Sequence, residues 1–302
     1  MGEPRVVALG GGHGLACVLR AARRYAGDML AVVSVADDGG SSGRLRRDLD
    51  VLPPGDLRRC LVALAAAELW PAAFEHRFSA GELEGHPLGN LVLAGLDETL
   101  GDPVAAIDAA ARLLGAVGRV RPATTEPVVL KADVDGESVE GQVAVMNVAG
   151  RIGRVELVPD DAPAHPEAVA AIGAADQVVL APGSLYTSLL PVLCVAGIRD
   201  AVATTRAQVV QVCNLRPQPP ETTGLDGGDH LRAVLDHGTR VDVFLTEADG
   251  ALAVDETQVG AWGVRVATGH LARPSGLAHD PVKLAPALAD LLESTRTEEG
   301  SR

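Results

Sequence analysis

The sequence predicts an α/β protein, with a mostly parallel β-sheet flanked by helices and a small β insertion near residues 118-158. Of the 302 residues, 47% are hydrophobic but only 2% are aromatic, so Val, Leu, Ala and Ile must build the core, which suits parallel strands covered by helices. Short apolar runs also alternate along the chain with segments of helical spacing. Because no linker rich in Ser, Pro or Gly divides the chain, we expect residues 1-302 to form a single domain.

The first strand and the first helix are joined by a glycine-rich loop. Val6 to Leu9 predicts a buried strand, and Leu15 to Tyr25 has the spacing of a helix. The loop between them offers backbone amides and consists of Gly10, Gly11, Gly12, His13 and Gly14. Glycines permit positive φ, so these amides can surround an anion at the positive end of the helix. The spacing matches neither the dinucleotide motif nor the P-loop, so a tight turn without a ligand stays an alternative, as does a solvent-facing His13.

A second loop follows the predicted strand Leu30 to Val35 and carries the acid pair Asp37 and Asp38. Carboxylates at the carboxyl end of such a strand can bind a ribose hydroxyl or hold Mg²⁺. The alternative is that they cap the next helix. Because five small residues follow the pair, which is more than capping requires, we favour a role in ligand binding.

Five arginines lie within sixteen residues: Arg44, Arg46, Arg47, Arg58 and Arg59. They form a basic patch in a protein of net charge −14, and one of them, such as Arg44, could clamp an anion, because guanidinium pairs bidentately with phosphate. The others are expected on a solvated helix face. Asp56 follows a rigid Pro-Pro-Gly turn and is expected to cap the helix Cys60 to Leu69.

The middle of the chain changes from helices to hairpins. Asn90 opens a helix predicted at Leu91 to Leu100, where amides can receive an anion, although ordinary helix entry is an equal alternative. A further helix is predicted at Pro103 to Leu114. From Gly118 to Val158 the predicted β-hairpins rest on two alternating runs and two turns, namely Val128 to Ala132, Glu140 to Val145, Asp135-Gly136 and Gly153.

The second half of the chain returns to strands, loops and helices. The strand Gln177 to Leu180 ends in a loop with Gly183, Ser184 and Thr187, which can face the first glycine loop across one crevice. An N-capped helix with Ser184 as its cap is the alternative. The remaining predicted elements are the helix Pro166 to Ala175, the strand Gln208 to Cys213 before Asn214, the helix His230 to His237, the strands Val241 to Leu245 and Val264 to Ala267, and the helix Pro281 to Leu292.

Charge and cysteine content exclude several classes of protein. The net charge of −14 opposes binding to nucleic acid and to anionic membrane surfaces. The four cysteines are far apart without a C-x-x-C motif, and no N-terminal signal is evident, so we expect a cytoplasmic protein with reduced thiols. The uncharged stretch Gln177 to Ile198 could cross a bilayer by length, but its prolines and glycines predict strand, loop and helix instead, and we expect no membrane insertion.

Six ordered blocks resemble the YvcK family, the gluconeogenesis factors, which belong with the CofD-like proteins. They are G-G-G-H-G-L at Gly10 to Leu15, A-D-D-G-G-S-S-G-R-L at Ala36 to Leu45, P-P-G-D-L-R at Pro53 to Arg58, H-P-L-G-N-L at His86 to Leu91, P-G-S-L-Y-T-S at Pro182 to Ser188 and V-C-N-L at Val212 to Leu215. The resemblance runs over nearly the whole chain, so the set is far more specific than any single block.

The resemblance implies a Rossmann-like fold and a cytosolic bacterial protein that binds a UDP-sugar, UDP-N-acetylglucosamine in particular. The implied role is regulatory and links sugar-nucleotide supply to cell-wall synthesis and cell shape during gluconeogenic growth, with no assigned reaction. The implied diphosphate contacts are the two glycine loops. The full set of implied ligand-binding residues is Gly10, Gly11, Gly12, His13, Gly14, Asp37, Asp38, Arg44, Asp56, Asn90, Gly183, Ser184, Thr187 and Asn214. Cell-wall synthesis proteins and a second copy of the chain are the partners left open.

A transferase is the alternative that the resemblance implies. CofD proteins transfer a phospholactyl group from an activated guanosine compound to a deazaflavin with the help of Mg²⁺, so Mg²⁺ is an optional cofactor here. An NAD-dependent oxidoreductase is weaker because the glycine spacing is wrong.

Three departures from the family pattern bear on the ligand. His13 stands where the family more often has Thr, the region Glu247 to Asp280 is shorter and has no tyrosine, and Ala278 precedes His279 where many members have Arg. The blocks expected to bind phosphate are unchanged.

Overall fold

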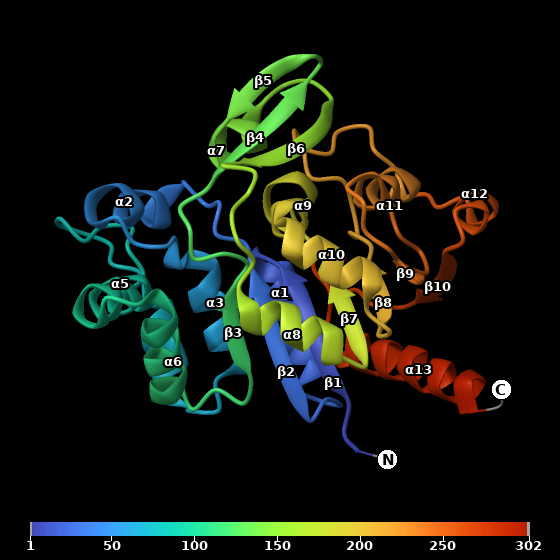
Figure 1. Ribbon diagram of the computed structural model, residues 1–302, viewed down its shortest axis with the longest axis horizontal. Helices are drawn as coiled ribbons and strands as arrows, with labels where there is room; N and C mark the ends of the chain where they lie inside the picture. The colour runs from blue at the N-terminus through green and yellow to red at the C-terminus, as the bar shows by residue number, and fades with distance from the viewer. Residues whose placement is uncertain (1, 301–302) are drawn as a thin grey trace.

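The computed structural model describes residues 2–300, with side chains as far as residue 297. Its centre is a seven-stranded sheet in the order β10-β9-β8-β7-β1-β2-β3, and Figure 1 shows the helices around it. All the pairings between neighbouring strands are parallel. The strands are β1 (Arg5–Gly10), β2 (Asp28–Val33), β3 (Arg119–Pro122), β7 (Gln177–Leu180), β8 (Gln208–Val212), β9 (Val243–Glu247) and β10 (Arg265–Gly269). The predicted α/β fold is confirmed.

The chain order of the strands reverses between β1 and β7. Val7 of β1 lies opposite Leu30 of β2 on one side and opposite Val178 of β7 on the other. The strands after β7 then extend the sheet away from β1. Because ligands of open parallel sheets bind outside the carboxyl ends of the strands at such a reversal, the loops after β1 and β7 lie where a site is expected.

Alternate side chains of the strands meet two layers of helices. Val6 and Ala8 belong to one core cluster, and Val7 and Leu9 belong to the other. The first layer comprises α1 (Gly12–Ala22), α3 (Pro54–Leu64), α5 (Leu88–Leu100), α6 (Pro103–Leu114) and α13 (Pro281–Gly300). The second layer comprises α8 (Pro166–Ala174), α9 (Leu190–Cys194), α10 (Ala196–Thr204) and α11 (Gly227–Asp236). Further helical segments are α2 (Gly40–Leu49), α4 (Leu69–Glu75), α12 (Glu256–Ala261) and the π-helix η1 (Leu185–Leu189).

A small antiparallel sheet with strand order β5-β4-β6 stands at the top of Figure 1. Its elements are β4 (Val129–Val134), β5 (Glu137–Glu140), α7 (Gln142–Asn147) and β6 (Ile152–Val158). The predicted insertion is therefore present, but it starts later than expected, because β3 belongs to the main sheet. The strand predicted at Glu140 to Val145 is wrong. Gly141 has φ +97°, and the Asp38 carboxylate accepts hydrogen bonds from the amides of Gln142 (3.0 Å) and Val143 (2.9 Å), so a helix starts there.

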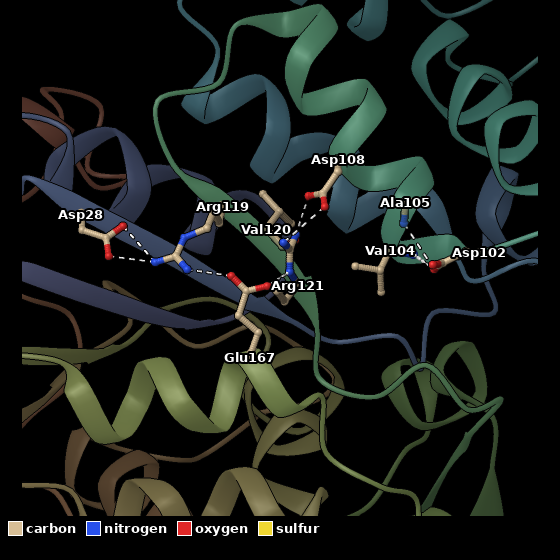
Figure 2. Close-up of polar contacts among 9 residues, drawn as sticks. All are labelled: Asp28, Asp102, Val104, Ala105, Asp108, Arg119, Val120, Arg121 and Glu167. Carbon is tan, nitrogen blue, oxygen red and sulfur yellow. Dashed lines mark hydrogen bonds and ion pairs between the residues drawn. The ribbon is translucent and has the colours of Figure 1, made fainter. Parts of the chain in front are cut away.

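The edge strand β3 is held by a chain of ion pairs, which Figure 2 shows. Arg119 contacts Asp28 of β2 at 2.8 Å and Glu167 of α8 at 2.7 Å. The neighbouring Arg121 side chain is 8% exposed, and it pairs with Glu167 and, at 2.7 Å, with Asp108 of α6. The network therefore joins the edge strand to helices of both layers.

Within residues 2–300, no single helix is long and apolar enough to cross a membrane. The segments Leu185–Cys194 and Ala196–Thr204 pass together by length and composition, but they are bent by 83° at the break between them. Their apolar side chains, including Leu193 and Ile198, lie in the core.

Candidate functional site

Two cavities open at the carboxyl ends of the parallel strands, and His13 lines both of them. The proline-lined cavity measures about 670 Å³, and its walls include Pro182, Leu215, Pro217, Pro219, Leu277 and His279. The arginine-lined cavity measures about 590 Å³, and its walls include Asp37, Ser41, Asp56, Arg58, Arg59 and Asn90. Both volumes fall in the range of small-molecule binding sites.

The amino end of α1 lies at the junction of the two cavities. The amide of Leu15 donates to the carbonyl of Gly11, so the amides of Gly12, His13 and Gly14 precede the hydrogen-bond ladder of the helix. The helix dipole adds a partial positive charge at this end. We call these three amides the α1 amide site. It can accept an anionic group that reaches into both cavities.

Two glycines of this loop are required for different reasons. Gly12 has φ +62°, a left-handed conformation that favours glycine. A Cβ at Gly14 would lie 1.6 Å from the carbonyl oxygen of Pro182. The loop after β1, which starts at Gly10 as the last residue of the strand, therefore packs directly on the loop after β7.

His13 is exposed at the rim that separates the two cavities. Partial burial, together with the charge of Arg59, lowers the pKa of this imidazole. Its neutral form therefore predominates at neutral pH, with one nitrogen as a donor and the other as an acceptor. The position allows contact with a ligand in either cavity.

In the loop after β7, the protein itself supplies an anion to the amides. The Glu221 carboxylate accepts hydrogen bonds from the amides of Tyr186 (2.7 Å) and Thr187 (2.9 Å) and from the Thr187 hydroxyl (3.2 Å). Glu221 is only 5% exposed, and this burial raises the pKa of its carboxyl group although the hydrogen bonds from the loop lower it. We expected a diphosphate to bind the amides of Gly183 to Thr187, but the amides of Tyr186 and Thr187 already donate to Glu221.

No sequence pattern indicated a role for Glu221 at the site. It lies in a polar segment with no motif, 34 residues beyond Thr187. Only the three-dimensional fold brings this carboxylate to the amides of η1. The same segment continues the wall of the proline-lined cavity through Pro217 and Pro219.

Asn214 holds the loop after β7 from the end of β8. Its Oδ1 accepts from the amide of Gly183 at 2.7 Å, and its Nδ2 donates to the Gly183 carbonyl at 2.8 Å. Asn214 therefore shapes the proline-lined cavity with its amide group already bonded at both ends. Ser184 precedes η1 without a side-chain capping bond to the backbone and lines the arginine-lined cavity.

Two carboxylates, Asp37 and Asp56, face the arginine-lined cavity from the loop after β2 and from the first turn of α3. Burial raises the pKa of Asp37, and the negative charge of Asp56 adds to this effect. The amide of Gly39, which donates to Asp37 at 2.9 Å, and the Ser42 hydroxyl act in the opposite direction. A cation between the two carboxylates would relieve their repulsion.

Asp56 is not the N-cap that the sequence predicted. Pro53 occupies the cap position of α3, and Asp56 pairs instead with Arg59 at 2.5 Å. One carboxylate from a loop and one from a helix start, both facing one cavity, match the way Mg²⁺ is held in proteins, because Mg²⁺ keeps several waters. Among the described residues no group of three or more His, Cys, Asp and Glu side chains could hold a metal ion.

Asp38 and Arg44 line neither cavity. The Asp38 carboxylate binds the first amides of α7. The expected pair is therefore split, since only Asp37 faces the cavity. Arg44 donates to the carbonyl of Glu84 at 2.8 Å. The guanidinium groups that line the arginine-lined cavity belong to Arg58, Arg59 and Arg77.

A buried hydrogen-bonded chain joins the amino ends of α2 and α5. Asn90 Nδ2 donates to Ser41 Oγ at 3.0 Å, and Ser41 Oγ lies 2.8 Å from His86 Nδ1. Burial, with the charge of Arg44, lowers the pKa of His86, so Nδ1 of its neutral ring can accept a hydrogen bond from the Ser41 hydroxyl. The sequence placed Asn90 near a helix start, but Ser41 lies 49 residues earlier, and no local pattern indicated that the two meet.

The fold and these cavities define an open parallel α/β protein with a ligand-sized site at the strand reversal. The sequence profile of the CofD family, described as 2-phospho-L-lactate transferase CofD, matches residues 6–268. The chain belongs to this family and, within it, to the gluconeogenesis factors of the YvcK type. The resemblance seen in the six sequence blocks is thus confirmed.

Relatives match over nearly the whole chain. A putative gluconeogenesis factor of Mycobacterium tuberculosis is 45% identical and aligns with 94% of this chain and 89% of its own length. The gluconeogenesis factor of Bacillus subtilis is 38% identical over 96% of this chain and 99% of its own. A crystal structure of a UPF0052-family protein from Bacillus halodurans has a TM-score of 0.92 at 38% identity and covers 96% of this chain and 99% of its own.

Proposed function

We propose that this protein is a cytosolic regulator that binds a UDP-sugar, UDP-N-acetylglucosamine, across the two cavities. The observation that carries the proposal is the α1 amide site at the junction of the proline-lined and arginine-lined cavities. A ligand with an anionic centre and two neutral ends fits such a junction. A nucleotide sugar has this form, because its diphosphate joins a nucleoside to a sugar.

Local positive charge supports an anionic centre in a protein whose net charge is −14. Arg20, Arg216 and Arg273 line the proline-lined cavity, and three further arginines line the other cavity. Ala278 lies in the proline-lined cavity where many members of the family have Arg, and Arg273 supplies a guanidinium to the same cavity. The departure at Ala278 therefore leaves a cation available to the ligand.

The regulatory role is proposed from the names of the relatives, which include gluconeogenesis factors. We propose that the ligand reports sugar-nucleotide supply and that the bound protein acts on cell-wall synthesis proteins and cell shape during gluconeogenic growth. A homo-oligomer is compatible with this role. None of the contacts assigned to the ligand requires catalysis.

A Mg²⁺-dependent transferase of the CofD type is the second candidate, and the pair Asp37 and Asp56 favours it. These two carboxylates would hold the ion with its waters, beside the α1 amide site. There Mg²⁺ would stabilise negative charge on a diphosphate. Arg59 pairs with Oδ1 of Asp56 at 2.5 Å, so Oδ2 is the oxygen that would bind the ion.

Isothermal titration with UDP-N-acetylglucosamine, UDP, GDP and NAD, each with and without Mg²⁺, tests the proposal. We expect saturable binding that is strongest for the UDP-sugar, with the ligand recovered unchanged. Absence of UDP-sugar binding contradicts the proposal. Mg²⁺-dependent consumption of an activated guanosine compound in the presence of a deazaflavin would establish the transferase instead.

A further inference from the structure

The two cavities differ in how their arginines are paired. In the arginine-lined cavity, Arg58 and Arg59 contact carboxylates of the protein at 2.9 and 2.5 Å. The third guanidinium there, that of Arg77, donates to a backbone carbonyl. All three positive groups of this cavity are therefore already bound by the protein itself.

The proline-lined cavity has three guanidinium groups that are free. They belong to Arg20, Arg216 and Arg273, which are all exposed and which form no hydrogen bond or ion pair in the described part of the chain. No carboxylate of the described residues lines this cavity, although the chain carries 40 Asp and Glu residues. Because like charges in one cavity repel one another, an anion bound there would be attracted by all three and would relieve their repulsion.

One face of α1 forms a wall of this cavity. His13, Cys17 and Arg20 lie at positions i, i+4 and i+7 of the helix, which share a face, and all three line the cavity. At the helical rise per residue, this wall extends roughly 10 Å from His13 to Arg20. The α1 amide site is at the His13 end, so the Arg20 end lies about two turns further along the helix.

Arg20 and Arg273 both lie near the middle of this wall. Burial raises the pKa of the Cys17 thiol to about 11, and the positive charges of Arg20 and Arg273 act on it in the opposite direction. Two guanidinium groups, one from α1 and one from the segment between β10 and α13, therefore come close to the same thiol. A diphosphate at the α1 amide site occupies the other end of the wall and leaves this pair available to another anion.

We propose that the proline-lined cavity binds a second anionic group of the nucleotide ligand, held by Arg20 and Arg273 beyond the diphosphate. Guanidinium pairs bidentately with a carboxylate or a phosphate, so either group suits the pair. This inference rests on the proposed binding of a nucleotide sugar. It adds that a nucleotide with a further carboxylate or phosphate binds more tightly than the same nucleotide without it.

The test uses two pairs of ligands in isothermal titration, and the members of each pair differ by one anionic substituent. UDP-N-acetylmuramic acid is UDP-N-acetylglucosamine with an added lactyl carboxylate, and guanosine 5′-diphosphate 3′-diphosphate is GDP with an added diphosphate on the ribose. We expect the wild type to bind the more anionic member of at least one pair about tenfold more tightly. The pair that shows this gain tells whether the second anion is attached to the sugar or to the nucleoside.

Variants of the chain assign the gain to the two arginines. In the double variant Arg20→Gln, Arg273→Gln we expect the gain to disappear, with affinity for UDP-N-acetylglucosamine unchanged. This variant should fold, because both side chains are exposed and have no partner among the described residues. The matched control is Arg24→Gln, which removes an exposed arginine just past α1 that lines neither cavity, and it is expected to keep the gain.

The other outcomes separate this inference from the proposed function. A wild type that binds UDP-N-acetylglucosamine but gains nothing from either added group overturns the second anion site and leaves the proposed function standing. Equal losses for both members of a pair in the double variant would place the arginines on the diphosphate, and they overturn the inference as well. A wild type that binds no UDP compound but shows an arginine-dependent gain for the guanosine pair contradicts the proposed function alone, and one that binds none of the four ligands overturns both.

Discussion

Replacing Glu221 tests whether a buried carboxylate holds the loop after β7. In Glu221→Ala the amides of Tyr186 and Thr187 lose acceptors at 2.7 and 2.9 Å, and the Thr187 hydroxyl loses one at 3.2 Å. In Glu221→Gln one oxygen still accepts, but the charge is removed. The two variants therefore separate loss of the hydrogen bonds from loss of the charge.

The expected loss follows from these contacts. Hydrogen bonds to a charged group contribute about 1.5–3 kcal/mol each, but ionising a buried carboxylate opposes part of this gain. We therefore expect the free energy of unfolding to fall by about 3 kcal/mol for Glu221→Ala. For Glu221→Gln we expect a loss of about 1 kcal/mol, since an acceptor remains.

Urea unfolding across a range of pH measures both effects. Burial raises the pKa of Glu221 above its ordinary value of 4.5, so the folded protein binds this proton more tightly than the unfolded chain does. The wild type should therefore be most stable relative to Glu221→Gln below pH 4.5. This relative stability should be lost as the pH rises from there through the raised pKa.

Three results would refute the reasoning about Glu221. One is a Glu221→Ala protein whose stability is within about 0.5 kcal/mol of the wild type, the ordinary effect of a surface substitution. Another is Gln as damaging as Ala at neutral pH. The third is an advantage of the wild type over Glu221→Gln that grows as the pH rises.

Three further substitutions test the contacts around the site. Gly14→Ala places a methyl group 1.6 Å from the Pro182 carbonyl oxygen and should destabilise the protein by about 2–3 kcal/mol in urea, whereas unchanged stability would mean that the two loops are not packed together. Asp38→Asn should speed hydrogen exchange in α7 about tenfold while the main sheet keeps its protection, and equal rates in α7 would contradict the capping role. Arg121→Gln removes two ion pairs of a nearly buried guanidinium and should lower the free energy of unfolding by about 1–3 kcal/mol, which chemical denaturation can verify or exclude.

The sheet and most helices could be predicted because their signals are local. The strand Gln177–Leu180 and the helix Pro103–Leu114 match their predictions residue for residue, since apolar runs and Pro and Gly boundaries mark both. Within the insertion, the sequence predicted a strand where the structure has the helix α7. Its alternating side chains imitate a strand, and the Asp38 carboxylate that starts the helix lies 104 residues before Gln142.

The site was only partly predictable, because many of its polar groups form hydrogen bonds with residues that lie far away in the sequence. The glycines of the first loop carried a local signal, and the α1 amides lie at the strand reversal. The partners of Asp38 and Arg44 are backbone groups far along the chain, so no local pattern showed that these side chains turn away from the cavities. The same holds for Glu221, whose carboxylate takes the amides expected to bind phosphate.

The central claim is that the α1 amide site binds the diphosphate of a nucleotide sugar, and Gly12→Asp tests it most directly. A Cβ at Gly12 meets nothing within 4 Å, so the substitution brings no clash at Cβ, and the strain at φ +62° should cost only about 1–2 kcal/mol. Titration of wild type and Gly12→Asp with UDP-N-acetylglucosamine should show binding by the wild type and at least about a hundredfold weaker binding by a folded Gly12→Asp protein, because two negative charges would meet at one site. A folded Gly12→Asp protein with wild-type affinity would contradict the account.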